Sequence, residues 1–74
     1  MGQIRDEILL KKIAMRLKEL REKANLSQEE LLNETNIHIG RIETGKNNLT
    51  IGTLKKLCVF FNIKLKDCFE EINK

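Results

Sequence analysis

The apolar residues of this 74-residue chain recur every three or four positions almost throughout, which is the spacing of one face of an α-helix. In the first segment the apolar stripe consists of Ile4, Ile8, Ile13, Leu17, Leu20 and Ala24. Two later segments repeat the spacing, with Leu54, Leu57, Cys58 and Phe61 in one and Leu65, Cys68, Phe69 and Ile72 in the other. The pattern predicts an all-α fold whose short helices share one core.

A complete helix-start signal lies in the segment LSQEEL, residues 26–31. Ser27 is expected to accept a hydrogen bond from the amide of Glu30, whose carboxylate accepts one from the amide of Ser27 in return. Leu26 and Leu31 have the spacing of a hydrophobic staple, which fixes the angle at which the chain enters the helix. A fixed angle determines how the following helix is presented to a partner.

The other helix ends are marked by residues that cap or stop helices. Thr50 is placed to cap the helix that contains Leu54. Asn25 and Asn62 tolerate the left-handed conformation that ends a helix, and Gly45 can end a short helix before it in the same way. These signals predict a compact bundle of five helices, forming a single domain over residues 1–74.

The composition agrees with a folded helical chain, since 41% of the residues are hydrophobic, 34% are charged and none is proline. No apolar run approaches the ~20 residues that cross a membrane. Cys58 and Cys68 lie on apolar helix faces, so we expect reduced core thiols in a cytoplasmic protein rather than a disulfide or a metal pair. Zinc would need further ligands, and His38 is the only histidine. No cofactor is expected.

The net charge is only +3, but the charges are unevenly distributed. Between Thr35 and Lys66 the single carboxylate is Glu43, against six cations. These cations are Arg41, Lys46, Lys55, Lys56, Lys64 and Lys66. The asymmetry indicates a positive face suited to phosphates, although an ordinary solvated surface would give the same count.

The segment between residues 33 and 48 combines apolar anchors with outward polar groups. Ile37, Ile39 and Ile42 are expected to anchor a short helix, from which Arg41 points outward. The loop that follows, with Thr44, Lys46, Asn47 and Asn48, is well supplied with donors for phosphate oxygens. A short helix held by a turn and flanked by amides and cations can place side chains in the major groove of DNA.

Three stretches in this order, KELREKANLSQEEL, GRIETGKNNLTIGTLKKLC and NIKLKDCF, resemble the Xre/Cro-type helix-turn-helix domain of bacterial and phage transcription regulators. The resemblance runs from about residue 13 to residue 69. It implies a five-helix lambda repressor-like fold that binds double-stranded DNA through its second and third helices, commonly as a homodimer on a two-fold operator.

The resemblance also implies roles for particular residues. Gln28 matches a glutamine that contacts the DNA backbone, and Arg41 matches an outward position of the recognition helix. Arg21 and Glu43 match a structural ion pair that ties the first helix to the end of the third. The full set of expected DNA contacts is Ser27, Gln28, Asn36, His38, Ile39, Gly40, Arg41, Thr44, Lys46, Asn47 and Asn48.

This chain is about three residues, or roughly one helical turn, shorter than the family pattern between Leu31 and Glu43. In one placement Asn36 and Ile37 form the turn and His38 caps a third helix that has lost its first turn. In the other, Thr35 caps a full-length third helix over residues 36–44, and the second helix is shortened. The first placement is favoured because it keeps Ile37 in the buried position of the turn.

The sequence is compatible with more than one function. An enzyme is not expected, because one histidine offers no Ser-His-Asp or Cys-His arrangement and no glycine-rich phosphate loop is present. A sequence-specific repressor or autoregulator is expected, with two copies docking their third helices in successive major grooves and no small-molecule ligand evident. The rival is a protein-interaction module on the same fold, such as an antitoxin or adaptor, in which Ile39 would stand exposed.

Overall fold

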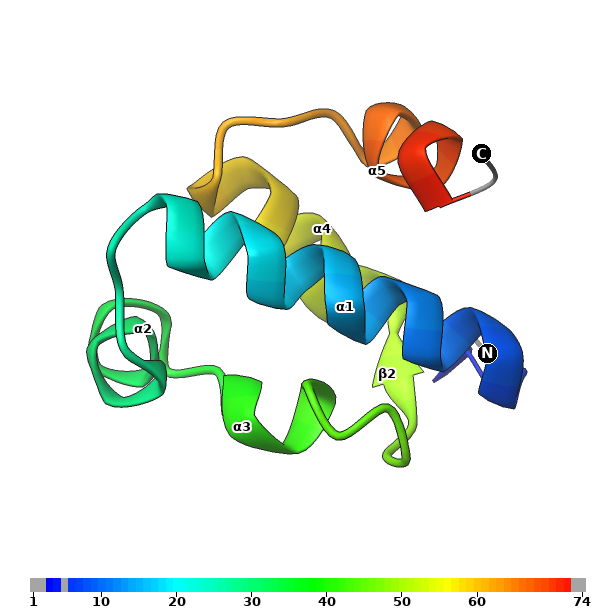
Figure 1. Cartoon of the computed structure of the whole chain (residues 1–74), viewed down its shortest axis with the longest axis horizontal. Helices are drawn as coiled ribbons and strands as arrows, with labels where there is room; N and C mark the ends of the chain where they lie inside the picture. Colours follow the sequence, from blue (N-terminus) through cyan, green and yellow to red (C-terminus); the bar gives the residue numbers. More distant parts are fainter. Residues whose placement is uncertain (1–2, 5, 73–74) are drawn as a thin grey trace.

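The structure, a computed structural model, describes residues 3–4 and 6–72, and the side chains of residues 6–68. Five helices and two very short strands follow one another along this part of the chain (Figure 1). The elements are β1 (Gln3–Ile4), α1 (Glu7–Lys23), α2 (Gln28–Thr35), α3 (Ile39–Ile42), β2 (Leu49–Thr50), α4 (Ile51–Phe60) and α5 (Leu65–Ile72). The predicted all-α fold is confirmed, with one small antiparallel strand pair added to it.

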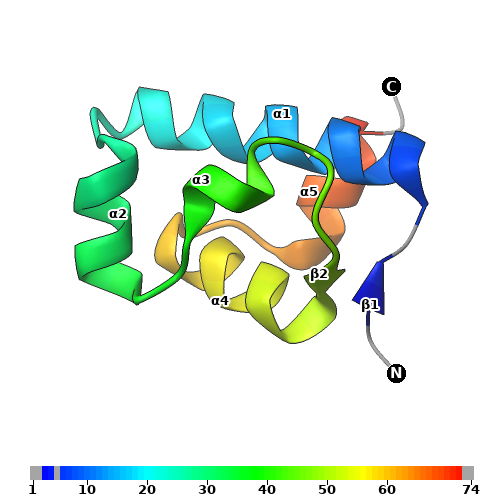
Figure 2. The ribbon, with the colours of Figure 1, turned by 90° about the horizontal axis from the view of Figure 1, so that it is seen from below.

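The long helix α1 runs along the molecule, with α5 above it and α2 and α3 below it in Figure 1, and Figure 2 shows α3 between α1 and α4. Each of the five helices and β2 contributes at least one side chain to a single core. The fully or almost fully buried apolar side chains are Leu10, Ile13, Leu17, Leu31, Ile39, Leu49, Leu54, Leu57, Cys58 and Cys68. Because the third helix shares this core, its position relative to the rest of the molecule is fixed by packing.

The predicted helix starts are present. The Ser27 Oγ accepts from the Glu30 amide at 3.0 Å, and the Glu30 carboxylate accepts from the Ser27 amide at 2.9 Å. The hydrogen bond from the Ser27 amide, and after it the Ser27 hydroxyl, lowers the pKa of the Glu30 carboxyl. Thr50 caps α4 by accepting from the Thr53 amide at 3.1 Å. Asp6 caps the start of α1 in the same way, by accepting from the Ile8 and Leu9 amides, and this cap was not predicted.

The predicted helix stops are present as well. Asn25 and Asn62 have φ of 57° and 59°, and each follows the last turn of a helix. The next amide in each case bonds back five residues, from Leu26 to the Arg21 carbonyl and from Ile63 to the Cys58 carbonyl. This is the Schellman arrangement, in which an apolar follower packs against the helix that has just ended. Gly45 also has a positive φ, of 70°.

The N-terminal part of the predicted apolar stripe is wrong. Ile8 is 70% exposed, and Leu10 occupies the core instead. Ile8 precedes Ile13 by five residues, which turns it well away from the buried face, whereas Leu10 precedes it by three. Ile4 lies in β1, paired with Leu49, rather than in a helix. The side chains of Ile4, Phe69 and Ile72 lie outside the described residues.

Candidate nucleic-acid interface

The turn between α2 and α3 follows the favoured placement. Helix α2 ends at Thr35, Asn36 adopts the left-handed conformation with φ of 59°, and α3 begins after His38. The alternative in which Thr35 caps a longer third helix is wrong. The Thr35 hydroxyl instead donates to the Leu31 carbonyl at 2.7 Å and accepts from the Ile37 amide at 3.1 Å. Helix α3 is therefore a single turn of four residues.

Ile39, one of the expected DNA contacts, is buried in the structure. Its side chain is 0% exposed and belongs to the central core. The physical reason is the shortness of α3, whose first residue must supply the apolar anchor that a longer helix could place further along. A protein-interaction module was expected to expose apolar residues on this face, such as Ile39, and Ile39 is not exposed.

Helix α3 is tied to α1 by the predicted ion pair. The Arg21 guanidinium donates to both carboxylate oxygens of Glu43, through Nε at 2.7 Å and Nη2 at 3.1 Å. A third donor of Arg21, Nη1, reaches the Leu26 carbonyl at 2.7 Å. Both side chains are nearly buried, with exposures of 11% for Arg21 and 5% for Glu43. Burial by itself would raise the pKa of Glu43, but the hydrogen bonds and charge of Arg21 and the hydrogen bond from Gln28 outweigh it and lower the pKa.

Gln28 joins this cluster, which sequence reasoning did not foresee. Its Nε2 donates to Glu43 Oε1 at 3.0 Å, so one carboxylate holds α1, the start of α2 and the end of α3 together. Gly40 leaves room beside the Gln28 amide. A Cβ on Gly40 would lie 3.1 Å from Gln28 Oε1. The amide of Gln28 is thus positioned by a contact within the protein, and Gly40 provides space for it.

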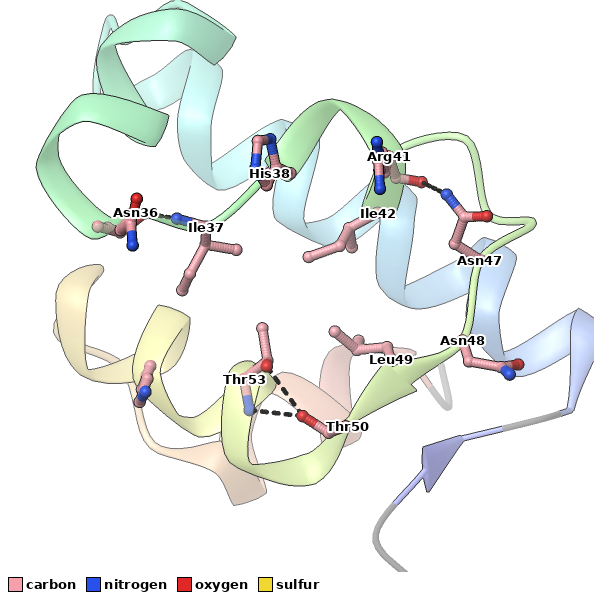
Figure 3. Close-up of a pocket in the computed structure, with 12 residues that line it drawn as sticks. Asn36, Ile37, His38, Arg41, Ile42, Asn47, Asn48, Leu49, Thr50 and Thr53 are labelled. Carbon is pink, nitrogen blue, oxygen red and sulfur yellow. Dashed lines mark hydrogen bonds between the residues drawn. The ribbon is translucent and has the colours of Figure 1, made fainter.

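The loop after α3 is held against the end of that helix. The Thr44 hydroxyl donates to the Arg41 carbonyl at 2.6 Å, and Asn47 Nδ2 donates to the same carbonyl at 3.3 Å. The Lys46 amide donates to Thr44 Oγ1 at 3.3 Å. Thr44 and Asn47 therefore fix the loop, while Arg41 is exposed and lies between His38 and Asn47 in Figure 3.

The remaining predicted contacts are exposed. His38, Lys46 and Asn48 lie on the surface, and Asn36 is exposed at the turn. Ser27 is exposed too, with its hydroxyl accepting the capping hydrogen bond. The structure brings these residues to the side of the molecule formed by the start of α2, by α3 and by the following loop (Figure 2).

A hollow of about 590 Å³, hereafter the α3–α4 hollow, opens between α3, the loop and the start of α4 (Figure 3). Its apolar lining is Ile37, Ile42 and Leu49, and its cationic lining is Arg41 and Lys56. The hydrogen-bonding groups that complete it come from Thr35, Asn36, His38, Asn47, Asn48, Thr50 and Thr53. None of the described residues that line it carries a carboxylate. A smaller hollow of about 300 Å³ on the other side of α3, against α2, is lined in part by Glu29.

The described residues offer no metal site and no membrane-spanning helix. They contain no group of three or more His, Cys, Asp and Glu side chains arranged to hold a metal ion. Nor does any helix in the described part of the chain have the length and apolar character needed to cross a membrane.

Comparison with known proteins gives one match. A family model described as helix-turn-helix matches residues 17–68, from the middle of α1 to α5. The matched region covers more than half of the chain and includes α2, α3 and the α3–α4 hollow. Neither a curated protein nor a solved structure gives a significant match.

Proposed function

Because the chain belongs to the Xre- and lambda repressor-like helix-turn-helix family, whose domains serve DNA-binding regulators, we propose that it is a sequence-specific repressor or autoregulator. In this proposal α3 enters the major groove and the start of α2 lies against the DNA backbone. Two copies bind a two-fold operator, with their α3 helices in successive major grooves about one DNA turn apart, and block access of the polymerase.

The proposal rests on the environment of Arg41. Its guanidinium is exposed and has no carboxylate partner among the described residues. Its backbone carbonyl is held by Thr44 and Asn47, and its helix is held by Glu43. A guanidinium on a fixed backbone can form the paired hydrogen bonds to guanine O6 and N7 that read a base in the major groove.

Other exposed groups on the same side would contact phosphates. Lys46 supplies charge, Asn48 supplies an amide, and the first turn of α2 offers backbone donors near Ser27 and Gln28. His38 and Asn36 line the same hollow as Arg41, where they would contact base edges or the backbone. These contacts position the protein, whereas Arg41 provides sequence readout.

Fluorescence anisotropy of a labelled random-sequence duplex tests the binding proposal. The wild-type protein is expected to bind at about 50 mM salt and to lose affinity steeply toward about 200 mM, because phosphate contacts release counterions. Arg41→Ala should weaken binding, while Lys12→Ala removes an equal charge from an exposed position on α1 and should change it little. Absence of binding at the lower salt concentration would reject the proposal and favour a protein partner.

A further inference from the structure

We propose that the α3–α4 hollow seats a sugar–phosphate segment of one DNA strand, and that Lys56 contacts its phosphate. The inference rests on the proposed function and adds a backbone contact that the sequence pattern did not assign. Lys56 lies in the second half of α4, outside the recognition helix and its loop.

Position is the first argument. An α-helix with its side chains is about 10–12 Å across, and the major groove is about 12 Å wide. A helix that enters the groove therefore has a sugar–phosphate wall on each flank. The α3–α4 hollow lies along one flank of α3, and Arg41 belongs both to its lining and to the outward surface of that helix.

Charge is the second argument. Arg41 and Lys56 bring two positive charges to the hollow from two different helices, and no carboxylate of the described residues lines it. Neither cation has a carboxylate partner within the described part of the chain. The hollow on the opposite flank also has Arg41 in its lining, but there Glu29 offsets that charge and would repel a phosphate placed beside it. The two flanks of α3 therefore differ, and the α3–α4 hollow is the one that suits an anion.

Hydrogen-bonding capacity is the third argument. The Thr50 hydroxyl accepts from the Thr53 amide at 3.1 Å and donates its own hydrogen to Thr53 Oγ1 at 2.8 Å (Figure 3). The hydroxyl hydrogen of Thr53 is consequently available to another acceptor. The side-chain amide of Asn48 also makes no hydrogen bond to the described residues and lines the same hollow. Both groups can donate to phosphate oxygens.

Shape and polarity complete the match. Ile37 and Ile42 are partly buried and point into the hollow, and the core residue Leu49 lies behind them (Figure 3). A free phosphate would gain nothing from these apolar side chains, because all of its atoms at the surface are polar. The carbon face of a deoxyribose is apolar and lies next to its phosphate, so a nucleotide unit of the backbone satisfies both parts of the lining.

The test compares Lys56→Gln with its neighbour Lys55→Gln. Lys55 is also exposed on α4 but does not line the hollow, so the pair removes the same charge from inside and outside the site. Binding of a duplex is measured by anisotropy over a series of salt concentrations. For Lys56→Gln the slope of log affinity against log salt should decrease in magnitude by about 0.9, with several-fold weaker binding at about 150 mM salt. Lys55→Gln should keep the wild-type slope.

A neutral methylphosphonate, placed at one backbone position at a time, identifies the contacted phosphate. At one position the substitution should weaken wild-type binding and have little further effect on Lys56→Gln. The assignment of Lys56 to a phosphate would be overturned if the two lysine variants had equal salt slopes. It would also be overturned if no methylphosphonate position were coupled to Lys56→Gln. Either result would leave DNA binding itself unaffected. If the wild-type protein binds no duplex, the proposed function fails first.

Discussion

Glu43 is a single carboxylate that connects three helices. It accepts two hydrogen bonds from Arg21 in α1 and one from Gln28 at the start of α2, and it follows the last residue of α3. Removal of one partner from a nearly buried pair costs more than the pair itself contributes, because the other charge stays buried without compensation.

Glu43→Ala should therefore lower the free energy of unfolding by about 3 kcal/mol. Glu19→Ala is the matched control, since it breaks the Arg16–Glu19 pair, which is longer at 3.4 Å and has an exposed carboxylate. Glu19→Ala should lower the free energy of unfolding by less than about 1 kcal/mol. Urea unfolding followed by circular dichroism measures both. Equal losses would show that the Arg21–Glu43 pair has no special structural role.

The Glu43 carboxylate predicts that the stability of the protein depends on pH. Its pKa is lower in the folded protein than the ordinary value of 4.5, so the folded state binds the proton less readily than the unfolded state. The stabilisation is complete above about pH 5 and is lost as the pH falls through the lowered pKa. The wild-type protein should lose more stability than Glu43→Gln between about pH 6 and pH 3, as measured by urea midpoints. Parallel pH profiles would contradict this origin of acid sensitivity.

Substituting alanine for each of two glycines should change the stability of the protein in opposite directions. Gly45 has φ of 70°, and a Cβ there would lie 3.0 Å from Lys11 Cγ and 3.2 Å from Lys11 Cα. Gly45→Ala should destabilise the protein by about 1–2 kcal/mol, because alanine disfavours the positive φ and its Cβ would crowd Lys11. Gly52 lies in α4, where an added Cβ would meet no neighbouring atom within 4 Å. Gly52→Ala should stabilise by about 0.5–1 kcal/mol in thermal or urea unfolding. A stabilising Gly45→Ala would be incompatible with the close approach of the loop to α1.

At the scale of elements, local signals predict helix ends well. Ser27 with Glu30, and Asn25 with Leu26, act within a few residues of sequence, so their pattern is sufficient to predict the caps and stops. Contacts between distant segments were not predictable in this way. Strand β1 exists only because Leu49 and Thr50 lie beside it, far along the chain.

Some features of helix α3 follow from its local sequence, and others depend on contacts with distant parts of the chain. Asn36 in the left-handed conformation follows from the local NETNI pattern, and the first of the two placements is confirmed. Burial of Ile39 and the reach of Gln28 to Glu43 depend on how a single-turn helix packs against the rest of the molecule. Periodicity cannot assign an inward or outward direction to residues of so short a helix.

The contact between α4 and α5 predicts how the two cysteines react. Cys58 and Cys68 are free thiols with exposures of 1% and 0%. Burial raises the pKa of Cys58, and burial together with the neighbouring Cys58 raises the pKa of Cys68 to about 11. Since the thiolate is the reactive form, both should resist alkylation at about pH 8 in the native protein and react together in urea. Rapid labelling of either native thiol, measured by mass spectrometry, would indicate that α5 opens.

At the scale of the whole molecule, a small core supports a surface with two different flanks. The single-turn α3 packs against α2 and is tied to α1 through Arg21 and Glu43, and the exposed residues around it include Arg41, Lys46 and Asn48. The helix-turn-helix family model matches residues 17–68, and the structure adds the α3–α4 hollow within that region. On the two-fold operator proposed above, symmetry predicts two chains per site.

In vitro selection from a random duplex library, carried out in parallel with the wild-type protein and Arg41→Ala, tests the central claim most directly. The wild-type protein should enrich a palindromic motif with half-sites centred about one DNA turn apart, and with a guanine in each half-site. Arg41→Ala should bind that motif more weakly, by about 1–3 kcal/mol, and lose the preference at that guanine. Failure of the wild-type protein to enrich any motif, or an identical motif and affinity for Arg41→Ala, would contradict the account.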